Sequence, residues 1–257
     1  MKQKIATTRA AAATILINQE SNKVLWARRN PALKFLGGFH GFTGGKVDKS
    51  DVDTKVRNCN DDEKKTNIAC AARELFEEVG VLLVRNGDKL TKGQRNSLHD
   101  DLISGRSSFA EILDHWGLWI DANDFSYTGF WTTPEFSKIR FKTHFFLAKC
   151  PPKQIPFRAI TELQEIEFID ANVAINKWSK SEVLIVPPVL FSLMELAKNT
   201  DIEIATKNLL EKSHKTGGDV NYIELNSRFT CFPLRTKTLP PATHTNCFIV
   251  GLSLIHI

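Results

Sequence analysis

The sequence contains no apolar run long enough for a membrane-spanning helix, which needs roughly 20 apolar residues. Residues 10–17 are apolar and follow Lys2, Lys4 and Arg9, as in a short secretory signal. However, polar residues occupy positions 18–22, where a cleavage site would require small side chains. We therefore expect a soluble, cytoplasmic protein with no membrane partner.

Cysteine and histidine motifs for zinc or redox chemistry are also missing from the sequence. The five cysteines lie far apart without a C-x-x-C pair, and the seven histidines show no H-x-H or H-E-x-x-H spacing. An odd number of scattered cysteines is typical of free thiols in a reducing compartment. Neither a disulfide framework nor a zinc site is expected.

A strong excess of charge of one sign is absent as well. The chain has 34 Lys and Arg against 29 Asp and Glu, a formal net charge of +5, and no long run of like charge. No nucleic-acid partner is expected, whereas a small anionic substrate is compatible with this balance. A length of 257 residues with 42% hydrophobic content allows one enzyme-sized domain and an additional segment.

The hydrophobic pattern alternates between strand and helix periods, which predicts an α/β (α+β) protein. Strands are predicted at residues 14–17, 23–28, 37–48, 81–84, 126–132, 141–149 and 165–169. Helices are predicted at about 65–79, twice within 91–116, and two or three times between 171 and 213. The polar residues 49–64 are predicted to form a loop.

The residues suited to catalysis are concentrated on the predicted helix 65–79. Glu74, Glu77 and Glu78 are spaced i, i+3 and i+4 and therefore share one side of the helix. Like charges at this spacing repel by about 0.2 to 0.5 kcal/mol per pair. Arg73 can pair with Glu77 at i+4 but cannot neutralise all three glutamates. A solvated helix face is one interpretation, and a site for Mg²⁺ or Mn²⁺, which prefer oxygen ligands, is the other.

The sequence around these glutamates resembles the Nudix box. That box is a glycine, five residues, a glutamate, seven residues, and then R-E-apolar-x-E-E-x-G-apolar. The segment Arg73-Glu74-Leu75-x-Glu77-Glu78-x-Gly80-Val81 matches the second half at every specified position, and Gly44-Gly45-Lys46-Val47 precedes it. Arg73 follows Gly45 by 28 positions (73 − 45) instead of 14, so 14 residues are inserted. The early glutamate has no clear equivalent among Asp48, Asp51 and Glu63.

The resemblance implies a Nudix fold, in which a mixed β-sheet is sandwiched between helices. It implies that Glu74, Glu77 and Glu78 hold the metal and that Arg73 orients one of these glutamates. A further catalytic carboxylate usually comes from a distant loop, for which Glu162 is the first candidate and Glu165 the second. The acids of residues 162–167 also fit the exposed alternate positions of an edge strand.

The implied activity is hydrolysis of a phosphoanhydride bond in a small nucleotide diphosphate substrate. Arg28 and Arg29 are candidates for phosphate contacts, or are simply an exposed basic pair. Gly44 and Gly45 would let the backbone approach the substrate closely. A nucleotide-binding Nudix module without catalysis and a hydrolase acting on nucleic-acid 5′ ends are the alternatives.

Three features resemble the branch that contains the peroxisomal coenzyme A diphosphatases. These are the insertion, Arg29-Asn30-Pro31 before the glycines, and Gly-Gly-Lys-Val-Asp in place of Gly-Gly-x-x-Glu; Thr43 departs from this branch, which commonly has proline there. Coenzyme A or acyl-coenzyme A is thus the first expected substrate. Other nucleoside diphosphate conjugates, such as ADP-ribose or NADH, are the alternative.

The composition changes near the C-terminus, which suggests more than one domain. We expect a Nudix hydrolase domain at residues 1–200, a helical and loop linker at 201–230, a truncated start of a metallo-β-lactamase-like domain at 231–251, and a non-native tail at 252–257. Residues 238–251 resemble the opening strand of that second fold, but its H-x-H-x-D-H zinc motif is absent. Residues 252–257 match a peptide encoded by a transposase sequencing adapter. The alternative is that this strand belongs to the Nudix domain.

Overall fold

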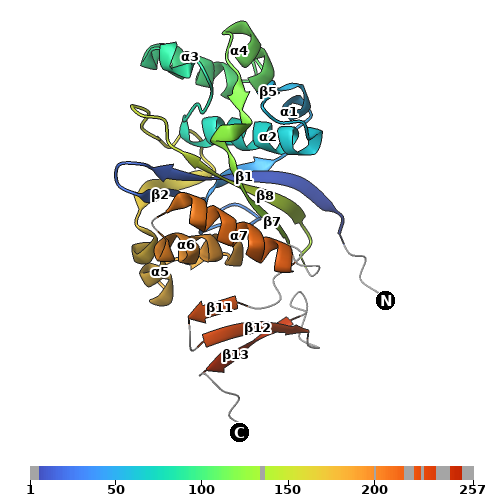
Figure 1. Ribbon diagram of the computed structural model, residues 1–257, viewed down its shortest axis with the longest axis vertical. Helices are drawn as coiled ribbons and strands as arrows, with labels where there is room; N and C mark the ends of the chain where they lie inside the picture. The colour runs from blue at the N-terminus through green and yellow to red at the C-terminus, as the bar shows by residue number, and fades with distance from the viewer. Residues whose placement is uncertain are drawn as a thin grey trace.

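A mixed β-sheet lies between two layers of helices (Figure 1). The computed structural model describes residues 6–133, 137–199, 201–216, 223–226, 229–235 and 244–250. Within these residues the sheet has eight strands, namely β1 (Thr8–Asn18), β2 (Lys23–Arg29), β3 (Phe39–Gly41), β4 (Thr43–Lys46), β7 (Ser126–Thr132), β8 (Arg140–Lys149), β9 (Leu163–Ile169) and β10 (Leu184–Ile185). The α/β sandwich predicted from the sequence is confirmed.

Strand β1 is the central element of the sheet. It runs parallel to β8 from the pair Thr8 and Arg140 to the pair Ile17 and Lys149. On its other edge, β1 pairs antiparallel with β2 near Ile17 and with β4 near Ala13, while β9 pairs with β2. Because side chains alternate along a strand, β1 contributes to a hydrophobic core on each face of the sheet.

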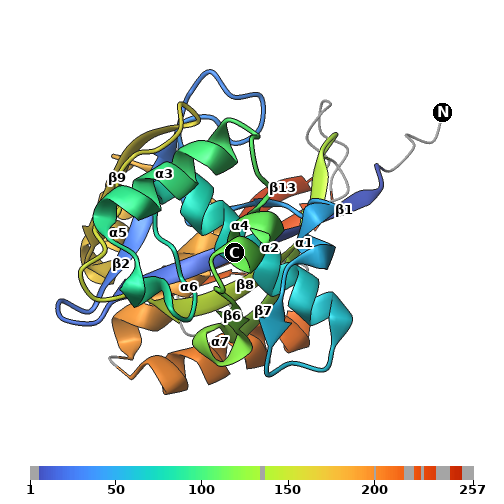
Figure 2. The ribbon, with the colours of Figure 1, turned by 90° about the horizontal axis from the view of Figure 1, so that it is seen from above.

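The helices cover both faces of this sheet. They are α1 (Ser50–Asp53), α2 (Asp62–Val79), α3 (Lys92–Ile103), α4 (Phe109–His115), α5 (Ala171–Ser179), α6 (Pro187–Lys198) and α7 (Ile202–Thr216), with the 3-10 turns η1 (Gly87–Lys89) and η2 (Ala122–Asp124). Helices α1 to α4 lie on one face, and α5 to α7 lie on the other (Figure 1). Viewed from above, α3 and α4 lie over α2 and the sheet (Figure 2).

Two segments differ from the sequence-based prediction. Residues 81–84 form no strand, because the backbone N–H and C=O of Leu82 bond to the side-chain amide of Gln154, at 2.8 and 2.9 Å, rather than to a neighbouring strand. The predicted loop 49–64 contains α1 and a short strand, β5 (Val56–Arg57), which pairs in parallel with β6 (Ile120–Asp121). The insertion is therefore ordered against a distant segment.

The C-terminal part begins with a helix that packs on the sheet. Ser213 of α7 bonds through its hydroxyl to both the N–H and the C=O of Phe130 in β7, each at 2.9 Å. Three further strands pair antiparallel with one another, namely β11 (Ile223–Asn226), β12 (Phe229–Arg235) and β13 (His244–Val250). The proposed second domain at 231–251 would include most of β12 and all of β13, and the domain division stays a prediction. Its tail, residues 252–257, lies outside the described residues.

Free thiols and the absence of a membrane span were both expected. Cys59, Cys70 and Cys150 are free. Among the described residues, none of the helices combines the length and the apolar character needed to cross a bilayer.

Candidate active site

Helix α2 carries the three candidate glutamates, and both of its ends are capped. The Asp61 carboxylate accepts the Lys64 N–H at 3.0 Å, which satisfies one of the free donors of the first turn. Gly80 ends the helix with a φ of 68°, and its N–H donates to the Phe76 carbonyl at 2.9 Å. A side chain at position 80 would also overlap the ring of Phe157, so the glycine of the motif is required for two reasons.

The glutamates do not lie on a solvated helix face. The hydroxyl of Thr14 in β1 donates to the Ala71 carbonyl at 3.1 Å and holds α2 on the sheet. The rings of His99 and Phe109, from α3 and α4, pack against Phe76 on the far side of α2. Glu78 is consequently only 4% exposed. Burial of this kind excludes the solvated-face interpretation of the motif.

The glycine pair of β4 lies directly against the glutamates. The Gly44 N–H donates to Glu78 Oε2 at 2.9 Å. A Cβ atom at Gly45 would overlap the carboxylate of Glu74. The antiparallel pairing of β4 with β1 thus brings together the two halves of the motif, although 28 positions separate Gly45 from Arg73.

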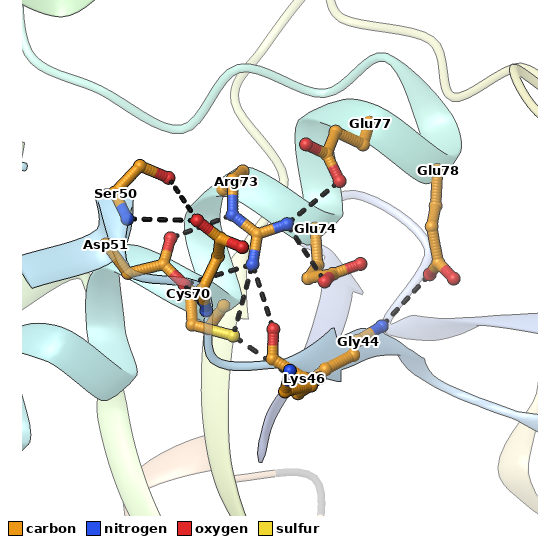
Figure 3. Close-up of polar contacts among 12 residues, drawn as sticks. Gly44, Lys46, Ser50, Asp51, Cys70, Arg73, Glu74, Glu77 and Glu78 are labelled. Carbon is orange, nitrogen blue, oxygen red and sulfur yellow. Dashed lines mark hydrogen bonds and ion pairs between the residues drawn. The ribbon is translucent and has the colours of Figure 1, made fainter. Parts of the chain in front are cut away.

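Arg73 is the centre of the polar network (Figure 3). Its Nη1 donates to both Glu74 Oε1 and Glu77 Oε2 at 2.9 Å. Its Nε and Nη2 donate to the two carboxylate oxygens of Asp51 at 2.8 and 3.0 Å, and Nη2 also donates to the Lys46 carbonyl at 3.0 Å. The guanidinium therefore fixes two of the glutamates relative to the β4–α1 turn.

Asp51 occupies the place of the early glutamate of the box. Its side chain is fully buried and also accepts the Asp48 N–H at 2.7 Å. The other two candidate acids have different partners. Asp48 Oδ1 accepts the Ser50 N–H, and Glu63 Oε1 lies 3.8 Å from Lys142 Nζ. The five intervening residues 46–50 after Gly45 are followed by Asp51, as the spacing of the box requires, so the sequence indicated this position. The 14 inserted residues therefore follow Asp51.

Burial raises the pKa of all three glutamates. The pKa of Glu78 is raised to about 8, first by burial and then by the charge of Glu74. The pKa of Glu74 is raised to about 7 by burial, against the opposing effect of Arg73. The pKa of Glu77 is raised by burial as well, with Arg73 again opposing. One guanidinium does not neutralise this cluster, and a bound cation would favour its ionised form.

The donor chemistry of the cluster fits a hard divalent cation. Carboxylate oxygens are the ligands that Mg²⁺ and Mn²⁺ prefer. In the part of the chain that the structure describes, no three acidic, histidine or cysteine side chains are arranged around a common metal position. Glu74 and Glu77 face Arg73, and Glu78 faces the Gly44 N–H. Metal binding would require these carboxylates to turn from their present partners.

The structure separates the remaining candidate residues into two groups. Glu162 Oε2 lies 3.7 Å from Arg29 Nη2. The charge of Glu162 raises the pKa of Glu78, so Arg29 and Glu162 both lie near the α2 cluster. Arg29 Nε is buried and has no hydrogen-bond partner within the described part of the chain. Arg28 and Glu165 pair at 3.6 Å. The two residues are partners in the pairing of β2 with β9, on the face of the sheet that also carries Trp26. This face is opposite the one that packs against α2.

A cleft of about 510 Å³ opens beside the cluster. It reaches from the α2 carboxylates to the connection between α3 and α4, which the sequence-based interpretation did not include. Its lining residues are Lys46, Val47, Asp48, Ser50, Arg73, Glu74, Glu77, Leu102, Gly105, Ser107, Ser108 and Phe109. Its volume is within the usual range for small-molecule sites.

Comparison with known proteins agrees with this geometry. Residues 7–116 match the family model of the NUDIX domain. A Caenorhabditis elegans protein named "Putative nudix hydrolase 7" is 26% identical over 227 residues, which cover 88% of this chain and 72% of that protein. The crystal structure of a NUDIX hydrolase from Alicyclobacillus acidocaldarius has a TM-score of 0.66 and 28% identity, and the match covers 79% of this chain and 96% of that one. Residues 7–116 are therefore similar to the NUDIX domain, and the chain has the Nudix fold.

Proposed function

We propose that this protein is a Mg²⁺- or Mn²⁺-dependent hydrolase that cleaves a phosphoanhydride bond in a small nucleotide diphosphate. The buried, incompletely neutralised carboxylate cluster beside Gly44 and Gly45 carries this proposal. Keeping buried acids with raised pKa values costs stability, which is typical of functional sites. A module that only binds nucleotides would gain nothing from this cost.

The residues have separate roles in the proposed reaction. Glu74, Glu77 and Glu78 hold the cation, and Arg73, fixed by Asp51, orients Glu74 and Glu77. A bound Mg²⁺ or Mn²⁺ supplies charge stabilisation at the phosphate oxygens and lowers the pKa of water. Glu162 accepts the proton of the attacking water. The new P–O bond forms to this water, and the bridging P–O bond breaks toward the leaving phosphate.

The contacts to the substrate are proposed on the same side of the sheet. In this proposal Arg29 donates to a phosphate oxygen, and the support is that its Nε is buried with no hydrogen-bond partner among the described residues. The backbone at Gly44 and Gly45 approaches the cluster without a side chain between them. The adjacent cleft of about 510 Å³ offers room for the rest of the substrate. Arg28 lies on the other face, so its proposed contact with phosphate finds less support than that of Arg29.

Coenzyme A and acyl-coenzyme A are our first proposal for the substrate. The support is the resemblance in the insertion and in the segments Arg29-Asn30-Pro31 and Gly44-Gly45-Lys46-Val47-Asp48. Fold alone does not determine a substrate, so ADP-ribose and NADH remain the alternative.

A substrate panel tests the proposal. Purified protein with Mg²⁺ or Mn²⁺ is incubated with coenzyme A, acetyl-coenzyme A, ADP-ribose, NADH and a dinucleoside polyphosphate, and the products are separated by chromatography. We expect diphosphate cleavage, fastest with the coenzyme A compounds. Cleavage of ADP-ribose alone would refute the substrate and keep the enzyme class, whereas binding without cleavage of any compound would refute the enzyme class.

Two variants link any measured activity to the cluster. Glu77→Gln and Glu78→Gln should each abolish turnover, because an amide is a weaker ligand for a hard cation than a carboxylate. Glu20→Gln, an exposed residue in the β1–β2 turn, is the matched control and should retain full turnover. Near wild-type rates in both cluster variants would show that the activity arises elsewhere.

A further inference from the structure

Asn30 connects the end of β2 to the segment that carries Glu162. Its backbone N–H donates to the Glu162 carbonyl at 2.7 Å. Its side-chain Nδ2 donates to the Thr161 carbonyl at 3.1 Å, while Oδ1 accepts the Ala32 N–H at 3.0 Å. The two ends of the Asn30 amide therefore have different roles. Oδ1 stabilises the turn after β2, and Nδ2 binds the segment that leads to Glu162.

The segment before Glu162 is held on its other side by α2. The Phe157 N–H donates to the Val79 carbonyl, and the Ala159 N–H donates to the Glu78 carbonyl, both at 3.1 Å. These bonds satisfy carbonyls of the last helical turn, which have no partner within the helix. The backbone leading to Glu162 is thus fixed at one end to the helix that carries Glu78.

The side chain of Glu162 has little packing of its own. It is 56% exposed, and its ion-pair distance to Arg29 is 3.7 Å. An exposed glutamate has considerable rotamer freedom, so the position of its backbone determines which positions the carboxylate can reach. Asn30 contacts that backbone at both Thr161 and Glu162.

We propose that Asn30 is a positioning residue, whose Nδ2 bond to the Thr161 carbonyl holds Glu162 beside Glu78 for proton transfer from the attacking water. This inference rests on the proposed hydrolase function. It also assigns a role to the asparagine of Arg29-Asn30-Pro31, which the mechanism above leaves unused.

The substitution Asn30→Asp tests the bond selectively. Aspartate keeps an oxygen that accepts the Ala32 N–H but replaces the donor with a second acceptor facing the Thr161 carbonyl. Partners that orient a catalytic ligand typically change activity by about 10- to 100-fold, and we expect a loss of kcat in this range with KM nearly unchanged. Asn30→Ser removes the same donor without adding charge and should show the same loss.

A matched control exists at the other end of β2. Asn18 Oδ1 accepts the N–H groups of Glu20 and Ser21, each at 3.0 Å, in the β1–β2 turn. Asn18→Asp makes the same chemical change in a turn that lies away from the glutamate cluster of α2. Its kcat should equal that of the wild type. A comparable loss in Asn18→Asp would overturn the inference, because it would show a general effect of the added charge.

A double-mutant cycle separates positioning from a structural role. Once Glu162→Gln has removed the carboxylate, adding Asn30→Asp should change kcat no further. If the two losses multiply, Asn30 acts independently of Glu162 and the inference is wrong. Wild-type protein that cleaves no phosphoanhydride would instead refute the proposed function. An active wild type with an unchanged Asn30→Asp variant would overturn this inference alone.

Discussion

The substitution Asp51→Asn should lower the free energy of unfolding by about 3 kcal/mol. The Asp51 side chain is fully buried, and it accepts two charge-assisted hydrogen bonds from Arg73, which is only 8% exposed. Removing one partner of a buried ion pair costs about 3 to 5 kcal/mol, because the other charge stays buried. Arg73 keeps Glu74 and Glu77 as partners, so we expect the lower end of this range.

Chemical unfolding monitored by tryptophan fluorescence measures this loss. For a chain of this size, about 3 kcal/mol corresponds to a melting temperature lowered by about 6 to 12 °C. Asp53→Asn is the matched control, since Asp53 lies on the same short helix α1 but is exposed. It should change stability by less than about 0.5 kcal/mol. Equal effects of the two substitutions would refute the role that we assign to Asp51.

Two further predictions concern the glutamates. Gly45→Ala should lower turnover by about 100-fold, since a Cβ there displaces the Glu74 carboxylate and small misplacements have such effects; Gly41→Ala, where a Cβ meets no neighbouring atom, should have no effect on turnover. Without metal, the contribution of Glu78 should lower the free energy of unfolding as the pH rises. The decline should run from the unfolded pKa of about 4.3 to the folded pKa of about 8, because the folded state binds more protons in that window. Thermal unfolding in a chelator between pH 5 and 9 checks this: Glu78→Gln should show a shallower decline, and identical pH profiles would contradict the raised pKa.

Helix α2 could be predicted because its signals are local. Apolar residues at helical spacing, a terminal glycine and the box motif all lie within residues 65–80, and the observed helix differs only by beginning at Asp62. The contact between Asp51 and Arg73 joins residues 22 positions apart, and no periodic pattern indicates it. Only the five-residue spacing after Gly45 could have identified Asp51.

Two other features depend on tertiary contacts that a sequence pattern does not reveal. The apolar residues 81–84 have strand-like composition, but a side-chain amide from Gln154 takes the hydrogen bonds that a neighbouring strand would supply. On β9, a register irregularity opposite Arg28 and Arg29 breaks the simple alternation of faces. Glu162 precedes the first residue of β9 and lies near the α2 cluster, while Glu165 of β9 lies on the other face of the sheet.

Binding of Mn²⁺ to the glutamates of α2 is the most direct test of the central claim. Free Mn²⁺ is measured by electron paramagnetic resonance during titration of wild-type protein, Glu78→Gln and the control Glu20→Gln. Glutamine at position 78 can still accept the Gly44 N–H and carries no buried charge, so the fold should be retained. We predict that the wild type and Glu20→Gln bind Mn²⁺ equally and that Glu78→Gln binds at least about 10-fold more weakly. Equal Mn²⁺ affinity in all three proteins would contradict the assignment of this cluster as the metal site.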